Sequence, residues 1–425
     1  MPAVRTALII GGGIAGPAAA VALRRAGVES VVYEARTDRG PRADSAPRAD
    51  TLISLWPNGV NALDVIGAAG AVRRSGWPAG RLAAFDNRGR LVGTCPLPSA
   101  SSTVNVRRTD LFRALADLAR AEGVPIRHGK HLVAAEQTPD GVVATFADGS
   151  TATGDILVGA DGVHSTARVL IDPEAPVPRY LPQLELSGVA DMSVPENTEA
   201  LCGVLGRRGS LAFWPRPDHR TEWFARLPLD RALPAGRALG RSAAECLEQA
   251  RRFYADDPFS HRMLTRTDPD QVSVIGSTVM LPSLPVWHRG RMVLVGDAAH
   301  APSSASGQGG ALALESAIEL ARCLRDLPTL DVAFRAYQRL RRPHVETIAA
   351  QALRAQRERG TRRIPNALLR LVWPIATRTF AAPAKTMNHA FHHRIDWHAA
   401  VPAALAENSE RHPEAQAPGC RCVVR

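Results

Sequence analysis

An apolar run at residues 4–10 opens the chain, and glycines follow it at once. The run is typical of a buried parallel strand, while the alanine-rich stretch at residues 17–25 favours a helix. A second apolar run, residues 30–33, ends in Glu34. This order of strand, glycine turn, helix and strand predicts the unit that binds dinucleotides.

The glycines of the first turn have separate tasks in such a unit. Gly11 permits the tight turn, Gly13 lets a pyrophosphate approach the backbone, and Gly16 lets the helix pack on the strand. The helix N-terminus offers free N–H groups and positive dipole to the phosphates. Glu34 is placed to accept hydrogen bonds from ribose hydroxyls and disfavours a 2′-phosphate, so we expect FAD or NAD rather than NADP.

Two more apolar runs end in glycine and a carboxylate. Residues 155–158 lead into Gly159-Ala160-Asp161-Gly162, and the run at residues 291–297 ends in Gly296-Asp297. Both are predicted to be strands. The turn Asp148-Gly149-Ser150 predicts a β-hairpin that returns the chain to the neighbourhood of the first strand.

The pattern changes to short strands from about residue 176 to residue 281. Alternating or apolar runs predict an antiparallel sheet, and a helix is predicted over 243–254. Phe213, Trp214, Trp223 and Phe224 are candidate linings of a substrate pocket, with ordinary packing within the sheet as the alternative for each. Aromatic residues are only 5% of the chain, so we expect a pocket lined mainly by aliphatic groups. The predicted strands are residues 184–191, 201–205, 210–215, 221–227 and 271–279.

Helical patterns dominate the last third of the chain. Gly307-Gln308-Gly309-Gly310 precedes a helix predicted over 311–324, and the N–H groups at such a helix start can stabilise negative charge on a bound ring. A second helix is predicted over 330–355. An apolar helix over 364–379 would either cover the substrate cavity or pack as an ordinary or oligomer-contact helix. Residues 406–425 are polar and expected to be disordered.

Histidines near the C-terminus raise the question of a metal site. His389, His392 and His393 would share one helix face, with His398 nearby. A site would also need a carboxylate or cysteine, so no metal is predicted. His300 follows the Gly-Asp pair closely, but we assign it no catalytic role.

Composition narrows the function further. The net charge is +11, and Lys130 and Lys385 are the only lysines among the 52 lysines and arginines, which indicates codon bias rather than a nucleic-acid surface. Six cysteines show no framework spacing, so reduced thiols are expected. No apolar stretch has transmembrane length and no signal peptide is seen, so we expect a cytoplasmic protein without a membrane span.

Taken in order, these motifs resemble the FAD-dependent aromatic hydroxylase family of the para-hydroxybenzoate hydroxylase type, the class A flavoprotein monooxygenases. The resemblance covers about residues 4–345. It implies an α/β fold in which a Rossmann-like FAD-binding domain of the glutathione-reductase type is intertwined with an antiparallel-sheet substrate domain, followed by C-terminal helices. The expected parts are residues 1–175, with substrate-domain insertions, and 282–360 for FAD, 176–281 for the substrate sheet, 361–405 for a helical segment and 406–425 for the tail.

The resemblance also implies roles for matching positions. The adenosine half of FAD would be held by the first turn and the Glu-x-Arg that ends at Arg36, and the ribityl hydroxyls by Asp297. Arg108 would lie near the ribityl and phosphate region, Asp161 and Gly162 would serve FAD and NAD(P)H, and Arg48 would face the flavin. The full expected set is Gly11, Gly13, Ile14, Ala15, Gly16, Glu34, Ala35, Arg36, Arg48, Arg108, Asp161, Gly162, Gly296, Asp297, Ser304, Gly307, Gln308, Gly309, Gly310 and Ala311.

Three departures from the family pattern lie near the flavin ring. Ser304 stands where the family usually has proline, Ser316 where it usually has aspartate, and residues 49–52 replace a glycine-rich stretch before the typical Trp56-Pro57-Asn58. They leave FAD binding in place and bear on the oxygen chemistry.

The activity that the resemblance implies is NAD(P)H- and O2-dependent monooxygenation. A flavin C4a-hydroperoxide would hydroxylate or epoxidise a hydrophobic small molecule, such as a natural-product intermediate, with NADPH or NADH as transient donor and a monomer or homodimer as the assembly. The first alternative is an FAD-dependent dehydrogenase or reductase, or a cyclase that uses FAD without redox chemistry. The second is a non-catalytic flavin-binding partner protein.

Overall fold

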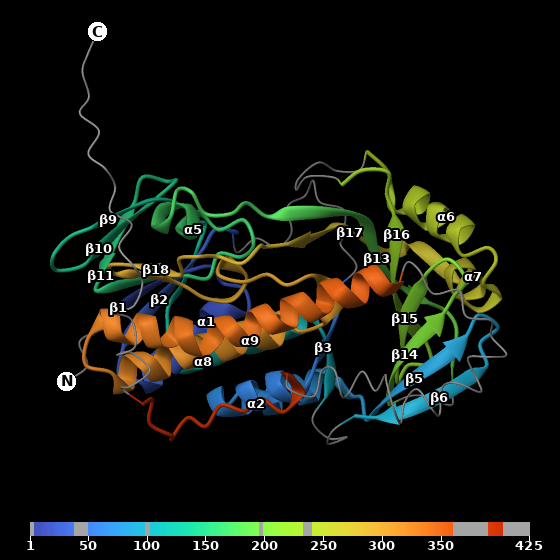
Figure 1. Ribbon diagram of the computed structural model, residues 1–425, viewed down its shortest axis with the longest axis horizontal. Helices are drawn as coiled ribbons and strands as arrows, with labels where there is room; N and C mark the ends of the chain where they lie inside the picture. The colour runs from blue at the N-terminus through green and yellow to red at the C-terminus, as the bar shows by residue number, and fades with distance from the viewer. Residues whose placement is uncertain are drawn as a thin grey trace, which may run out of the picture.

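Two large sheets at opposite ends of the molecule organise the fold (Figure 1). The computed structural model describes residues 4–37, 50–97, 103–194, 199–232, 240–359 and 390–402, and all statements below concern these residues. Arg48, Lys385, His389, the predicted helix over 364–379 and the tail 406–425 lie outside them.

The first sheet has six strands in the order β18-β19-β12-β1-β2-β8, and its centre is parallel. The central strand, β1 (Thr6–Ile10), is buried from Ala7 onward, as expected for a strand covered on both faces. The other strands are β2 (Glu29–Glu34), β8 (Ile126–His128), β12 (Ile156–Gly159), β18 (His288–Arg289) and β19 (Met292–Leu294).

Helices cover this sheet and connect its strands. The helix α1 (Ala15–Arg25) is rich in buried alanines, and this lets it lie close to α8 (Gly309–Asp326). The long α9 (Leu330–Arg359) runs beside α8 toward the second sheet (Figure 1). The remaining helices of this part are α2 (Pro57–Ile66), α3 (Ala69–Ser75), α4 (Arg108–Ala121) and α5 (Thr166–Ile171).

Two three-stranded sheets flank the first sheet. One contains the predicted hairpin, with Gly149 in the left-handed region (φ +81°) between its strands. The other places β3 (Leu52–Leu55) against β7 (Val104–Arg107) in antiparallel register. The remaining strands are β4 (Trp77–Pro78), β9 (Leu132–Gln137), β10 (Val142–Phe146) and β11 (Thr151–Gly154).

The second large sheet has seven strands in the order β17-β13-β16-β15-β14-β5-β6. Its outer face packs on α6 (Ala243–Phe253) and α7 (Pro258–Thr265), which lie on the far side of the sheet from α9 (Figure 1). The strands are β5 (Arg81–Asp86), β6 (Leu91–Pro96), β13 (Arg179–Ala190), β14 (Ala200–Leu205), β15 (Ser210–Pro215), β16 (Thr221–Pro228) and β17 (Thr267–Met280).

Alternation along these strands corrects the predicted pocket. Phe213 and Trp223 are fully buried in the core between the sheet and its outer helices, and the Trp223 indole donates to Thr267 Oγ1 (2.9 Å). They are therefore packing residues and do not line a pocket. Trp214 and Phe224, one position along, belong to the opposite face, because successive side chains of a strand point to opposite sides.

The predicted helices and strands are found with shifted ends. The predicted helices over 243–254, 311–324 and 330–355 correspond to α6, α8 and α9. The strand predicted over 291–297 is shorter, because Gly296 adopts φ +59° and starts a 3₁₀ turn, η2 (Gly296–Ala298). A second 3₁₀ turn, η3 (Ser304–Ser306), precedes α8.

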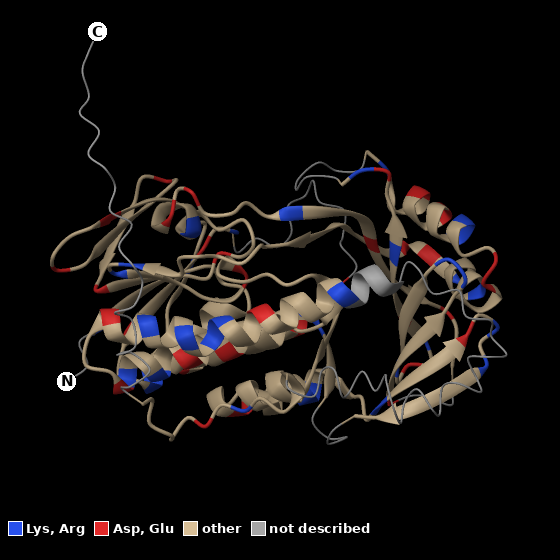
Figure 2. Ribbon diagram, in the orientation of Figure 1, with Lys and Arg blue, Asp and Glu red and all other residues tan. Residues whose placement is uncertain are grey.

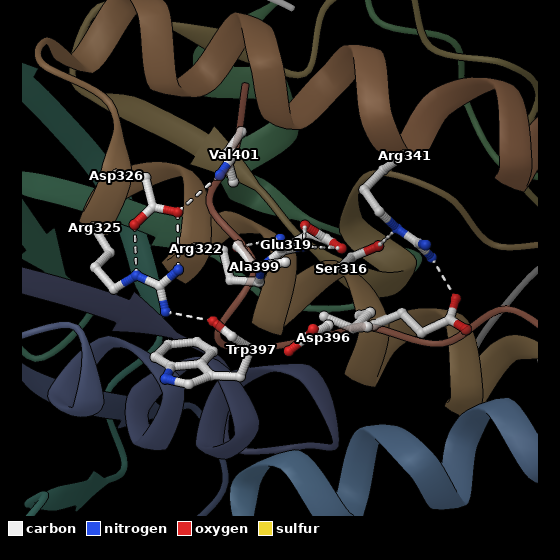
Figure 3. Close-up of polar contacts among 12 residues, drawn as sticks. Ser316, Glu319, Arg322, Arg325, Asp326, Arg341, Asp396, Trp397, Ala399 and Val401 are labelled. Atoms are coloured by element: carbon white, nitrogen blue, oxygen red, sulfur yellow. Dashed lines mark hydrogen bonds and ion pairs between the residues drawn. The ribbon is translucent and has the colours of Figure 1, made fainter. Parts of the chain in front are cut away.

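A C-terminal segment, residues 390–402, returns to the end of α8 (Figure 3). Arg325 bonds to Asp326 and donates to the Trp397 carbonyl (2.6 Å), and Arg322 donates to the Ala399 carbonyl (2.8 Å). Phe391 stacks on Trp56 with 4.6 Å between ring centres. The segment therefore joins α8 to α2.

The distribution of charge and the hydropathy of the helices can be compared with the expectations from the sequence. Both acidic and basic positions occur along α8 and α9 in the view of Figure 2. None of the helices in the ranges described above combines the length and the apolar character that crossing a bilayer requires.

Candidate functional site

The first glycine turn is built so that only glycine fits at two positions. A Cβ on Gly11 (φ +111°) would lie 2.3 Å from the Ala160 carbonyl oxygen, and one on Gly16 would lie 1.8 Å from the Gly11 carbonyl oxygen. A Cβ on Gly13, in contrast, would meet no atom within 4 Å. The turn is therefore tight underneath and open above Gly13, as a phosphate-binding turn requires.

Glu34 is fixed by the backbone around it. Its carboxylate accepts hydrogen bonds from the Gly12 N–H (2.6 Å) and the Arg36 N–H (2.8 Å). These bonds hold the side chain beside the glycine turn, where it remains partly accessible. Ala35 and Arg36 are exposed beyond it. The structure thus brings Glu34 to the turn that the sequence pattern assigned to it.

Asp161 serves the fold as well as the expected cofactor region. Its carboxylate accepts from Ser165 Oγ (2.5 Å) and from the Ala167 N–H (3.0 Å), which places it at the start of α5. Burial raises the pKa of Asp161, and these hydrogen bonds oppose the rise. Gly162 follows in the left-handed region (φ +82°).

The turn at Gly296 lies against the first glycine turn. A Cβ on Gly296 would approach Ala15 Cβ to 2.7 Å, so the two turns touch through their smallest residues. Asp297 is accessible to solvent, yet protein surrounds it closely enough that burial raises its pKa to about 6 against the opposing charge of Arg108. Arg108 and Asp297 are therefore brought together although 189 positions separate them in the chain.

The start of α8 completes the arrangement. Gly307 adopts φ +61°, and its carbonyl oxygen accepts from Trp56 Nε1 (3.0 Å). A Cβ on Gly310 would lie 3.5 Å from Ile14 Cδ1, whereas one on Gly309 would meet nothing within 4 Å. The N-termini of α1 and α8 thus lie together, each with an open glycine. The predicted Ala311 is buried in the first turn of α8.

A buried polar network behind α8 was not predicted from the sequence. Asn58 Nδ2 donates to Gln308 Oε1 and to Glu315 Oε1, at 3.0 Å each. Glu315 Oε2 accepts from Arg341 Nη2 (2.7 Å), and each of these two side chains is 1% exposed. Burial alone would raise the pKa of Glu315, but Arg341, with two histidines, holds it well below its usual value.

The two histidines are His344 of α9 and His393 of the C-terminal segment. Their ring nitrogens lie 3.6 Å and 3.1 Å from the carboxylate of Glu315. The three residues are close enough to hold a metal ion. The carboxylate is, however, already neutralised by Arg341, whose guanidinium would repel a second cation at this site. The sequence pattern predicts that His393 shares a helix face with His389 and His392, but His393 lies beyond the helical turn at residues 390–391, and no sequence signal indicates its partners.

His300 belongs to the same network. Its Nε2 lies 2.7 Å from Ser316 Oγ, which also accepts from Arg341 Nε (3.2 Å). Burial lowers the pKa of His300 to about 3, so the ring is neutral at physiological pH. His300 and Arg341 are thus polar partners of Ser316, the residue that stands where the family usually has aspartate.

The inner face of the seven-stranded sheet turns toward these loops. The Trp214 indole donates to Ser54 Oγ (3.1 Å) of β3, and Ser54 donates to Asn105 Oδ1 (2.7 Å). Phe224 is partly accessible on the same face. Arg226 reaches from this face to Ser304 in η3, with 3.0 Å between its Nη2 and the serine Oγ. The sheet is therefore joined directly to the loop that precedes α8.

Comparison with known proteins agrees with this geometry. The family model described as "FAD binding domain" matches residues 5–352. The chain belongs to the FAD-dependent aromatic hydroxylase family. It is therefore an FAD-dependent monooxygenase with the mixed α/β fold of the flavoprotein hydroxylases.

Individual relatives within the family span most of the chain. An FAD-dependent urate hydroxylase of Klebsiella pneumoniae is 31% identical over 358 residues, 81% of this chain and 88% of the relative. A 3-amino-4-hydroxybenzoate 2-monooxygenase of Streptomyces platensis is 32% identical over 376 residues, 83% and 87% of the two chains. The crystal structure of Klebsiella pneumoniae HpxO with FAD and uric acid has a TM-score of 0.76 at 27% identity, covering 91% and 96%.

The residues present fit FAD. The open space above Gly13 and Gly309 lies at two adjacent helix N-termini, and phosphates or a ring with negative charge are favoured there. Glu34 and Asp297 offer carboxylate oxygens to hydroxyl groups at two separate places. Gln308 Nε2 is buried with no hydrogen-bond partner among the described residues. The family uses FAD as its cofactor, and NAD(P)H is the electron donor typical of it.

Proposed function

We propose that this enzyme uses NADPH or NADH and O2 to hydroxylate a small electron-rich aromatic or heteroaromatic compound. One observation supports the proposal most directly. The N-termini of α1 and α8 lie together, and the Arg226–Ser304 hydrogen bond joins the loop before α8 to the inner face of the seven-stranded sheet. Bound FAD would supply electron transfer from the nicotinamide and the activation of O2.

Residues of the chain would divide the remaining tasks. Gly13 and Glu34 would hold the adenosine diphosphate half, and Asp297 and Arg108 would orient the ribityl chain. The N–H groups of Gly309 and Gly310 would stabilise negative charge on the ring when it is reduced. The Trp214–Ser54 hydrogen bond would keep β3 against the sheet and so exclude water from the space between them.

The substrate is expected to be aromatic because the two relatives named above act on urate and on 3-amino-4-hydroxybenzoate. The accessible Phe224 on the inner face favours stacking with a planar ring. The same face carries Arg226 and Glu222, so it is more polar than the aliphatic pocket expected from composition.

The visible spectrum of the purified protein tests the proposal. We expect a yellow protein whose flavin band bleaches with anaerobic NADPH or NADH and recovers in air. With candidate substrates, O2 uptake without matching H2O2 release would establish oxygen insertion. Nicotinamide oxidation that never incorporates oxygen would support a dehydrogenase or reductase instead, and a protein that cannot be loaded with FAD would refute the assignment.

A further inference from the structure

The C-terminal segment, residues 390–402, is bonded to α8 near both ends of that helix. At the last turn, the Val401 N–H donates to the Asp326 carboxylate (3.0 Å), as Figure 3 shows. Nearer the start of α8, His393 Nδ1 lies 3.1 Å from Glu315 Oε1. The first residues of the segment are thereby held close to the loop that precedes α8, residues 304–310, called the cofactor loop below.

Phe391 is connected to the cofactor loop through Trp56. Its ring is 1% exposed and stacks on the Trp56 ring with 25° between the ring planes. The Trp56 indole donates to the Gly307 carbonyl oxygen (3.0 Å), and a Cβ on Gly307 would lie 3.1 Å from Trp56 Nε1. The ring that Phe391 supports is therefore in direct contact with the loop.

His393 is connected to the same loop through Glu315 and Asn58. Glu315 Oε1, which His393 approaches, also accepts from Asn58 Nδ2 (3.0 Å). The same Asn58 nitrogen donates to Oε1 of Gln308 (3.0 Å), the residue that precedes the first turn of α8. Asn58, Glu315 and Gln308 are each at most 1% exposed, so water competes little for these hydrogen bonds.

Both connections meet at the start of α2. Trp56 and Asn58 flank Pro57, whose ring fixes the backbone at the first turn of the helix. A Cβ on Gly59 would lie 2.9 Å from Ala311 Cβ, so α2 and α8 approach each other through small residues. Trp56 and Asn58 thus belong to one rigid turn that lies against the start of α8.

Phe391 also links this turn to the second large sheet. It forms a small buried apolar cluster with Trp56, and Leu82 of β5 and Leu201 of β14 pack against that cluster. The C-terminal segment therefore contacts the place where α2 and the seven-stranded sheet meet, next to the cofactor loop.

We propose that the C-terminal segment sets the position of the cofactor loop, with Phe391 and His393 as its two positioning residues. The inference rests on the proposed function, in which N–H groups at the start of α8 stabilise negative charge on the reduced flavin ring. Donors that are held in place need no reorganisation when this charge appears, whereas a loosened loop stabilises it less. Loss of either contact should therefore shift the midpoint potential of the bound flavin to a more negative value.

The test uses the FAD-loaded full chain with His393→Leu and Phe391→Leu. Three quantities are measured: the FAD dissociation constant, the midpoint potential of the flavin, and the hydrogen exchange of the peptide that contains residues 304–310. Each variant should weaken FAD binding by about 3- to 10-fold, as expected for a coupling between neighbouring side chains. Each should also speed amide exchange in the loop and make the potential more negative. His393→Gln keeps an N–H donor and should recover most of all three losses.

Matched variants separate positioning from stability. His392→Leu, at the exposed neighbouring histidine, should leave the three quantities as in the wild type. In an Asn58→Leu background the connection from His393 is already cut, so His393→Leu should change the FAD dissociation constant by less than about 2-fold further. Phe391→Leu acts through Trp56 and should keep its full effect in that background.

Variants that lower the urea midpoint of unfolding but leave loop exchange, FAD affinity and potential unchanged would overturn the proposal, because the segment would then only add packing. Equal effects of His393→Leu with and without Asn58, or no recovery in His393→Gln, would also contradict it. If His393→Leu does not fold, Phe391→Leu and His393→Gln decide by the same three measurements. A wild type that binds no FAD would instead refute the proposed function.

Discussion

Replacing Arg341 by methionine should destabilise the protein strongly, because it leaves the Glu315 carboxylate charged inside the core. The pair is 1% exposed on both sides, with 2.7 Å between Nη2 and Oε2. Breaking a buried ion pair from one side costs about 3–5 kcal/mol, equivalent to a fall of roughly 10²- to 10⁴-fold in the folding equilibrium. Asn58 and His393 still donate to Glu315, so we expect the lower half of that range.

The pH dependence gives the prediction a second, independent readout. In the wild type the lowered pKa of Glu315 contributes stability above its unfolded pKa, and this stability is lost as pH falls through the folded pKa. Without Arg341, burial dominates and raises the pKa of Glu315 instead. The variant should therefore be penalised most at neutral pH, and the gap to the wild type should narrow in acid.

Urea unfolding at saturating FAD, followed by far-UV circular dichroism, measures the effect with cofactor linkage held constant. The double variant Arg341→Met with Glu315→Leu removes both charges and should regain more than half of the lost stability. Arg342→Met, at a partly exposed neighbour on the same helix that pairs with Glu346, serves as the control. The reasoning fails if Arg341→Met unfolds within about 0.5 kcal/mol of the wild type, or if the double variant is as unstable as the sum of the single ones.

Two predictions concern the cofactor turns. Gly16→Ala should yield little folded protein, because its Cβ would lie 1.8 Å from the Gly11 carbonyl oxygen. Gly13→Ala should fold with a normal circular dichroism spectrum, and its FAD affinity, measured by fluorescence titration, should be at least about 10-fold weaker. FAD affinity should fall as pH drops through about 6, where Asp297 gains its proton, and Asp297→Asn should bind weakly with no such step; an unchanged step in that variant would assign the titration to another group.

The positions of the candidate cofactor residues could be predicted from the sequence, because the backbone geometry of the glycine turns determines them. Gly11, Gly16 and Gly296 sit where a side chain would collide with a neighbouring chain segment, and such a requirement is visible at a single position. Glu34 and Asp297 follow predicted strands directly, so their places are set by local order. The order of α and β elements then fixed the parallel sheet and the position of α8.

The residues that face the substrate side could not be predicted from the sequence in the same way. Of four aromatic candidates, Phe213 and Trp223 face the outer helices, and strand alternation alone excludes all four from one pocket. Which pair faces inward depends on the helices that cover the other side. The contacts of His393 and Arg341 with Glu315 join three segments far apart in the chain, and no periodic pattern links such residues.

The cofactor turns and the substrate-side sheet of this chain depend on different kinds of contact. In the proposed site FAD would be held largely by N–H groups and by positions without side chains, and such a site tolerates change elsewhere in the chain. The Glu185–Arg226–Ser304 cluster depends on three side chains from two strands and one loop, and each can change without disturbing a glycine turn. Ser304, in place of the family's usual proline, supplies a hydroxyl that contacts both Arg226 and Glu185. Side chains of this kind can therefore differ among relatives that are only about 30% identical, such as the urate hydroxylase and the 3-amino-4-hydroxybenzoate 2-monooxygenase.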